Sequence, residues 1–259
     1  DGLLEAYKAF GEDAYLSEAV SVFNYLKNNN YKDGELVHSY TKDSKRKEVF
    51  LEDYAFLAKS AFSLYEVTLD VSYLKTSKEL MNIGSEKFKS TSELFYYNVS
   101  SDLVPSIINT SDGVVPSANA IMAQNFLRIG HLEYNIDYLK KAEAMGALIT
   151  GDFESHAISY GAWGSLLLQQ AYPFYEIVVV GSDAEELMSA IHKKYIVNSI
   201  IVGSIVESDI SLFKDRYNGD DTFIYVCQNN TCKLPVNTTH DAFYQMKSFG
   251  YQGFNWIYE

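Results

Sequence analysis

Two adjacent carboxylates, Glu52 and Asp53, are the side chains of this sequence best suited to chemistry. Cleavage of a glycosidic bond needs two carboxyl groups, one to protonate the leaving oxygen and one to activate water or attack carbon. Neighbouring helix residues point about 100° apart, so we expect at most one of the two to line a site. Asp53 lies on the less polar helix row and is the better candidate. The alternative is structural, because the helix dipole favours acids in a first turn.

A histidine and two tyrosines lie close to these acids in the sequence. His38 and Tyr40 precede the acidic helix, and Tyr54 follows Asp53 directly. We expect His38 to reach the same cavity as a third catalytic group, with Tyr40 and Tyr54 binding substrate hydroxyls. A surface or capping histidine is the alternative. The five histidines show no metal-ligand spacing, so the sequence predicts no metal site and no cofactor.

Ser117 and Asn119 are further candidates for binding a substrate. Pro116 suits the start of a helix, and Ser117 suits its cap. Asn119 falls on an apolar helix face, where a polar side chain must find a hydrogen-bond partner. That partner is either a ligand hydroxyl or the backbone of the preceding loop.

The only two cysteines, Cys227 and Cys232, are separated by four residues. Thioredoxin-type redox motifs have two residues between their cysteines, and no second pair is present to complete a zinc site. Three interpretations remain open: a disulfide that closes a turn, two buried thiols, or a redox pair.

Paired amphipathic helices must position these residues. Similar segments that begin at Asp13, Asp70 and Asp137 each open a helical stretch, and their tyrosines are 58 and 65 residues apart. This period exceeds the 34 to 47 residues of common helical solenoids and favours αα-hairpins with long loops. The apolar spacing predicts helices over 50–65, 70–88, 116–129 and 135–149, and a largely buried helix over 153–172.

The pattern changes after Pro173. Strands are predicted over 176–180, 199–202 and 222–226, and helices over 182–192 and 239–247. Ser182 and Glu185 have the spacing of a capping box for the first of these helices. We therefore expect a helical-hairpin domain over 1–173 and a small α/β unit over 174–259.

Three motifs in order carry a resemblance to a known family. The sequence reads Phe-Leu-Glu-Asp-Tyr-Ala at 50–55, Asp-Gly-Val-Val-Pro-Ser-Ala-Asn at 112–119 and Cys-x4-Cys-x-x-Pro at 227–235. The set resembles the thioredoxin-fused family of YyaL-like proteins and spermatogenesis-associated protein 20, although Ala118 stands where the family pattern usually has glycine. The resemblance implies an N-terminal thioredoxin-like domain as a partner within the full-length protein. It also implies an (α/α)6 toroid related to six-hairpin glycosidases and sugar epimerases. About seven long helices cannot close a ring of twelve, so we expect a mainly α, incomplete toroid.

Two functions follow as hypotheses. The first is a glycoside hydrolase or sugar epimerase that binds a carbohydrate in the toroid cavity, and it rests on fold analogy. The second is a non-catalytic redox or client-binding module that works with the thioredoxin-like domain. Apolar helix faces left open by a partial ring favour a homo-oligomer or a further segment as their cover.

The net charge of −13 argues against nucleic acid and anionic membranes as partners, because both need clustered basic residues. Asn-x-Ser/Thr sequons favour secretion and two free-looking cysteines oppose it. The compartment is left open, with the cytoplasm slightly favoured.

Overall fold

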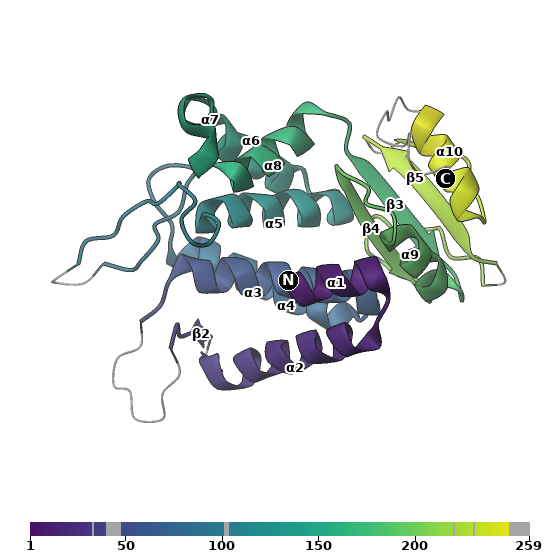
Figure 1. Ribbon diagram of the computed structural model, residues 1–259, viewed down its shortest axis with the longest axis horizontal. Helices are drawn as coiled ribbons and strands as arrows, with labels where there is room; N and C mark the ends of the chain where they lie inside the picture. Colours follow the sequence, from purple (N-terminus) through teal and green to yellow (C-terminus); the bar gives the residue numbers. More distant parts are fainter. Residues whose placement is uncertain (33, 40–47, 101–103, 220, 230, 249–259) are drawn as a thin grey trace.

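Three helical hairpins form most of the molecule in the computed structural model, which describes residues 1–32, 34–39, 48–100, 104–219, 221–229 and 231–248 (Figure 1). The pairs are α1 (Gly2–Phe10) with α2 (Asp13–Asn30), α3 (Leu51–Thr68) with α4 (Val71–Lys87), and α5 (Ala118–Glu133) with α6 (Ile136–Ala147). Within the described residues there are ten α-helices, one four-stranded sheet and one two-stranded sheet. The prediction of a mainly α chain built from hairpins is confirmed.

Short polar side chains set where the return helices begin. Asp70 Oδ1 accepts a hydrogen bond of 2.8 Å from the amide of Ser72 at the start of α4. Asn135 Oδ1 accepts bonds from the amides of Asp137 and Tyr138 at the start of α6. These caps satisfy amides that have no partner inside their helices. They explain why the repeated segments at Asp70 and Asp137 open helices where the sequence predicts them, whereas the segment at Asp13 opens α2 without a side-chain cap.

The centre of the hairpin region is made by α3 and α5, which pack against each other. Each is buried along most of its length, with Tyr54, Phe62 and Tyr65 of α3 and Met122 and Ile129 of α5 fully enclosed. Burial of large side chains of this kind is the main favourable term in folding. The two helices therefore provide a rigid base for whatever lies at their ends.

The single helix predicted over 153–172 is wrong. The chain instead forms α7 (Thr150–His156), a 3-10 turn (Ala157–Ser159) and α8 (Gly161–Ala171). Asp112, from a distant loop, accepts a bond of 2.9 Å from the amide of Ala162 and caps α8. Only Trp163 and Leu166 of α8 are buried, so the expected burial on most sides is also wrong.

The sheet has the order β4-β3-β5-β6, from β3 (Tyr175–Val180), β4 (Ser199–Ser204), β5 (Phe223–Gln228) and β6 (Thr231–Cys232). β3 runs parallel to β4 and antiparallel to β5. Alternate residues of β3 face opposite sides: Ile177 and Val179 contact α9 (Ala184–His192) and α10 (Thr239–Ser248), while Val178 and Val180 join the core of the hairpins. The sheet thus stands between α9 and α10 on one face and the hairpins on the other (Figure 1).

The capping box predicted at Ser182 and Glu185 is wrong. Asp183 is the residue before α9, and no side chain caps that helix. Gly181 turns with φ +136°, where an added Cβ would meet the backbone of Thr222 at 2.5 Å. Thr222 Oγ1 also accepts a hydrogen bond of 2.9 Å from the amide of Asp183, and with this contact the helix begins one residue later than a cap at Ser182 would place it.

The change from helices to sheet falls close to the predicted boundary at 173. Val178, Val180, Ile200 and Val202 nevertheless belong to the same buried cluster as α3 and α5. The division into two domains stays a prediction. No helix in the described ranges is long and apolar enough to span a bilayer.

Candidate functional site

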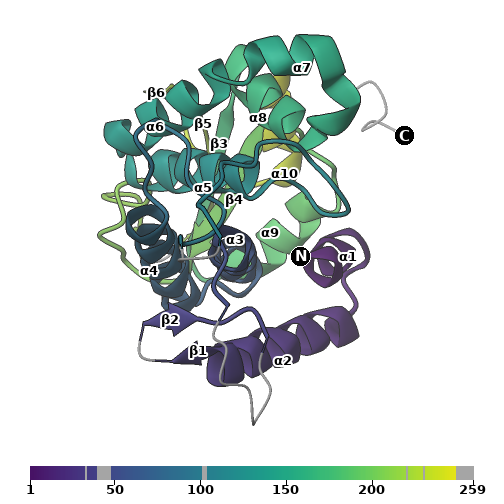
Figure 2. The same ribbon diagram turned by 90° about the vertical axis from the view of Figure 1, so that its left-hand side faces the viewer.

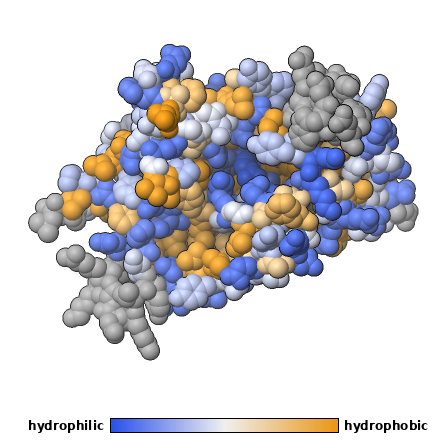
Figure 3. Space-filling model, viewed as in Figure 1, coloured by the Kyte–Doolittle hydropathy of each residue, from blue (hydrophilic) through white to orange (hydrophobic). Residues whose placement is uncertain are grey.

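A cavity of about 310 Å³ lies between the end of α2, the segment that follows β2 and the first half of α3. Figure 2 shows β1 (Tyr31–Lys32) and β2 (Glu35–Leu36) beside α2 at this end of the molecule. Apolar side chains gather over this space on the surface (Figure 3). The lining residues are Leu26, Asn30, Leu36, Val37, His38, Glu52, Asp53, Phe56, Leu57, Ser60 and Val115. The cavity therefore has mostly apolar walls and one polar end.

The polar end is a histidine held by two carboxylates. His38 Nδ1 lies 3.0 Å from Asp53 Oδ1 and 3.9 Å from Glu52 Oε1. The expectation that at most one of the adjacent acids lines the site is wrong. His38 approaches the helix end from a separate segment and lies within reach of both side chains, although they leave the helix in different directions.

Aromatic contacts hold this histidine in place. The His38 ring stands edge-on to Phe50 with centroids 5.1 Å apart, and Phe50 stacks on Tyr97. Burial and a hydrogen bond to Glu52 raise the pKa of Tyr97 to about 12, so its hydroxyl stays a donor. A backbone hydrogen bond also ties the segment of His38 to the residues just before α3, because the amide of His38 donates to the carbonyl of Glu48 at 2.8 Å.

The pKa values of the two partners of the ion pair are raised for different reasons. The hydrogen bond with Asp53 is the largest cause that raises the pKa of His38. Burial raises the pKa of Asp53, and the bonds from His38 and from the amide of Phe50 oppose that rise. The bond from Phe50 also satisfies a helix-end amide, so Asp53 has the structural role of a first-turn acid as well. His38 is 42% exposed and open to a ligand.

The histidine spacing predicted no metal site, yet ligand atoms of His38, Glu52 and Asp53 lie within 4.8 Å of one another. Sequence spacing misses this group because its histidine comes from outside the helix. His38 and Asp53 already satisfy each other through their hydrogen bond. We therefore describe these residues as a hydrogen-bonded ion pair and not as a metal site.

Two of the predicted substrate-binding residues, Tyr54 and Ser117, do not line the cavity. Tyr54 is fully buried, and its hydroxyl accepts a hydrogen bond of 2.8 Å from the amide of Leu36. Ser117 is 3% exposed and stands at the start of α5 without capping it. Its hydroxyl donates to the carbonyl of Asn109, and its amide donates to Asp112. Tyr40 lies outside the described residues.

Asn119 has the loop partner that the sequence left open. Its Oδ1 accepts the amide of Phe95 at 2.8 Å, and its Nδ2 donates to the carbonyls of Phe95 and Asn109, both at 3.0 Å. The side chain is fully buried. It organises the loop before α5, and the ligand-binding role is wrong.

Sequence reasoning missed several lining residues. Leu26 and Asn30 come from α2, and Val115 comes from the loop before α5. Asn30 Nδ2 donates to the carbonyl of Val37 at 3.0 Å and fixes the segment that carries His38. A single asparagine at a helix end carries no sequence signal for such a role.

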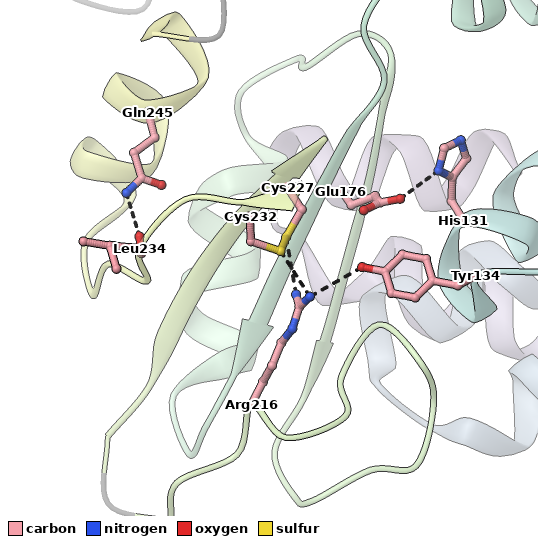
Figure 4. The surroundings of a disulfide bond; sticks show 8 residues. All are labelled: His131, Tyr134, Glu176, Arg216, Cys227, Cys232, Leu234 and Gln245. Carbon is pink, nitrogen blue, oxygen red and sulfur yellow. Dashed lines mark hydrogen bonds and ion pairs between the residues drawn. A yellow bond between two sulfur atoms is a disulfide. The ribbon is translucent and has the colours of Figure 1, made fainter. Parts of the chain in front are cut away.

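Cys227 and Cys232 form a disulfide between β5 and β6 (Figure 4), and β5 lies at the opposite end of the molecule from β2 (Figure 1). Of the three interpretations of this pair, the one with two free thiols is wrong. Arg216 reaches both sulfurs, with Nη1 3.4 Å from Cys227 Sγ and Nη2 3.2 Å from Cys232 Sγ. Nothing in the sequence pointed to this arginine.

Comparison with known proteins identifies relatives. Over 204 residues, 72% of this chain, it is 25% identical to spermatogenesis-associated protein 20 of Rattus norvegicus and 24% identical to that of Homo sapiens. It is 25% identical over 257 residues to an uncharacterized protein of Caenorhabditis elegans. The matched part is 26% of the mammalian proteins and 35% of the nematode protein. No family model matches the chain. These relatives agree with the resemblance that the three ordered motifs carry, and the chain is similar to spermatogenesis-associated protein 20.

Proposed function

We propose that the cavity between α2 and α3 binds a carbohydrate or related polyol, and that His38 and Asp53 act on it as an acid–base pair. The observation that carries this proposal is the ion pair of 3.0 Å at the polar end of a cavity with apolar walls. Small-molecule sites commonly combine such walls with a few polar groups that fix orientation. Because the chain spans about a quarter to a third of its relatives, the activity of the whole protein is part of the proposal.

Proton transfer fits this geometry better than hydrolysis. The two carboxyl groups of a glycosidase stand about 5–5.5 Å or 6.5–9.5 Å apart and leave the space between them to the sugar or to water. Here ligand atoms of Glu52 and Asp53 lie within 4.8 Å of each other and of His38, and both acids contact that histidine. A paired histidine and carboxylate is a common general acid and base. An epimerase-like proton transfer is therefore favoured over hydrolysis.

Calorimetric titration of the protein with neutral sugars and sugar phosphates tests the proposal. We expect at least one of these probes to bind, and Asp53→Asn and His38→Gln each to weaken its binding roughly ten- to hundredfold, the value of a hydrogen bond to a charged group. Glu18→Gln removes an acid from the exposed face of α2 and serves as the matched control, with unchanged binding expected.

Thermal unfolding of each variant separates a lost contact from a lost fold. The proposal is wrong if no probe binds the native protein, or if Asp53→Asn and His38→Gln bind as well as Glu18→Gln does.

A further inference from the structure

We propose that the Cys227–Cys232 disulfide is a redox site that exchanges electrons with a dithiol, and that Arg216 stabilises the thiolates of its reduced form. The site lies at the edge of the sheet (Figure 4), and β5 lies at the opposite end of the molecule from β2 and the start of α3 (Figure 1). It does not depend on the function proposed for that cavity.

A purely structural role explains little about this bond. A disulfide stabilises a protein mainly by closing loops of the unfolded chain, and longer loops gain more. Here the sequence separation is five residues. Pairing of β5 with β6 already joins the same two cysteines in register. The bond therefore adds little constraint to a hairpin that the backbone closes.

Arg216 lies where a thiolate would need a cation. Its two terminal nitrogens are 3.4 Å from Cys227 Sγ and 3.2 Å from Cys232 Sγ. The sulfurs of a disulfide are weak acceptors, so this position gains more when the sulfurs carry charge. A neighbouring guanidinium lowers the pKa of a cysteine thiol and favours the thiolate. The arrangement thus favours the reduced form more than the oxidised form.

Neighbouring groups fix the guanidinium without neutralising it. The hydroxyl of Tyr134 lies 3.4 Å from Arg216 Nη2, and the ring centroid of Tyr225 lies 5.0 Å from the guanidinium carbon. The hydroxyl of Tyr225 donates to the backbone carbonyl of Arg216 at 3.2 Å. No carboxylate of the described residues forms an ion pair with Arg216, so its charge is available to the sulfurs.

The exposure of the two cysteine residues sets the order of the exchange. Cys227 is fully buried, whereas Cys232 is half-buried. A thiolate of the dithiol attacks Cys232 Sγ, forms a mixed disulfide and expels Cys227 as a thiolate beside Arg216. The second thiol of the dithiol then loses its proton and attacks the dithiol's own sulfur in the mixed bond, and Cys232 leaves. Two electrons pass to the protein, the dithiol becomes a disulfide, and its two protons pass to the cysteines or to water.

Reduction of the native protein with stepped ratios of reduced to oxidised dithiothreitol tests this site. Alkylation followed by mass measurement counts the free thiols, which is unambiguous because the chain has two cysteines. We expect both to be reduced while circular dichroism retains the folded signal. We expect Arg216→Gln to need a roughly tenfold higher ratio, as for about one unit of thiol pKa, and Arg216→Lys a smaller increase. Lys214→Gln, an exposed charge on the same loop, should leave the ratio unchanged.

A second measurement needs no variant. The alkylation rate of the reduced native protein should rise with a midpoint below about 8.5, the ordinary pKa of a cysteine. The proposal is overturned if reduction occurs only together with unfolding. It is also overturned if the midpoint is at or above the ordinary value, or if Arg216→Gln and Lys214→Gln behave alike.

Discussion

His38 and Asp53 come from segments fifteen residues apart, and their contact sets the charge of the cavity. The imidazole gains a proton more easily beside the carboxylate, while burial makes the carboxylate harder to ionise. Both groups therefore take up a proton more readily than two isolated groups would. That is the property that general acid–base chemistry uses.

A pH titration of His38 by NMR should report a pKa above its ordinary value of about 6.5. Asp53→Asn should lower it towards that value, because it removes the largest cause of the rise. Since the folded pKa is the raised one, the stability that His38 contributes is fully present below pH about 6.5 and is lost as the pH rises through the folded pKa. The penalty of His38→Gln in denaturant unfolding should therefore shrink at high pH. A penalty that grows with pH would contradict the ion pair.

Asn119 shows how a site residue can be misassigned from sequence. We expect Asn119→Ala to cost roughly 2–4 kcal/mol of unfolding free energy, because it removes three hydrogen bonds to the backbone, two of them to the buried Phe95. Chemical denaturation measures this cost, and sugar binding serves as the second readout. A cost within about 0.5 kcal/mol, as for a surface substitution, would contradict the structural role.

At the scale of helices and strands, local sequence patterns predicted the elements correctly, whereas features that depend on contacts between distant residues were not predicted. The apolar stripe of α3 and the cap at Asp70 are encoded within a few residues, so both helices fall where the sequence predicts them. The break before α8 depends on Asp112, some fifty residues away, and no local pattern reveals it. The contacts of His38 with the two acids and of Arg216 with the cysteines were not predicted for the same reason, because the partners lie elsewhere in the chain.

Close packing of α5 on α6 depends on Gly130. A Cβ there would lie 2.8 Å from Leu139 Cδ2 and 3.2 Å from the backbone nitrogen of Leu139. We expect Gly130→Ala to destabilise the protein by about 1–3 kcal/mol, the usual cost of overpacking, despite the higher helix propensity of alanine. Gly151→Ala in α7, where nothing lies within 4 Å, is the control and should be neutral or stabilising by up to about 1 kcal/mol. Equal effects in thermal unfolding would contradict this packing.

Across the whole molecule, a buried charge cluster and a shared core join the separate elements. Glu66 of α3 is 2% exposed and binds Arg128 of α5 and Lys8 of α1. These cations outweigh burial and lower the pKa of Glu66 to about 2. His192 of α9 lies beside the cluster, and burial lowers its pKa to about 4, which keeps it neutral. The cluster thus links the hairpins to the α/β unit.

Glu66→Gln should cost about 3–5 kcal/mol at neutral pH, because it leaves two partly buried cations without their acid. The folded pKa is lowered, so the stability from Glu66 is present above its ordinary value of 4.5 and is lost as the pH falls towards about 2. The difference between native protein and variant should therefore narrow over that window in urea unfolding. Glu93→Gln, at the more exposed pair with Lys141, is the control, with an expected cost below about 1 kcal/mol.

The most direct test of the account is NMR of the His38 ring and nearby backbone amides during titration with the sugar that binds best in calorimetry. If the cavity binds the sugar, the signals of His38, Leu36 and Val37 should shift and saturate together, with the amides of β5 unchanged. Saturating sugar that leaves His38 and its neighbours unmoved would contradict it, as would shifts confined to another part of the chain.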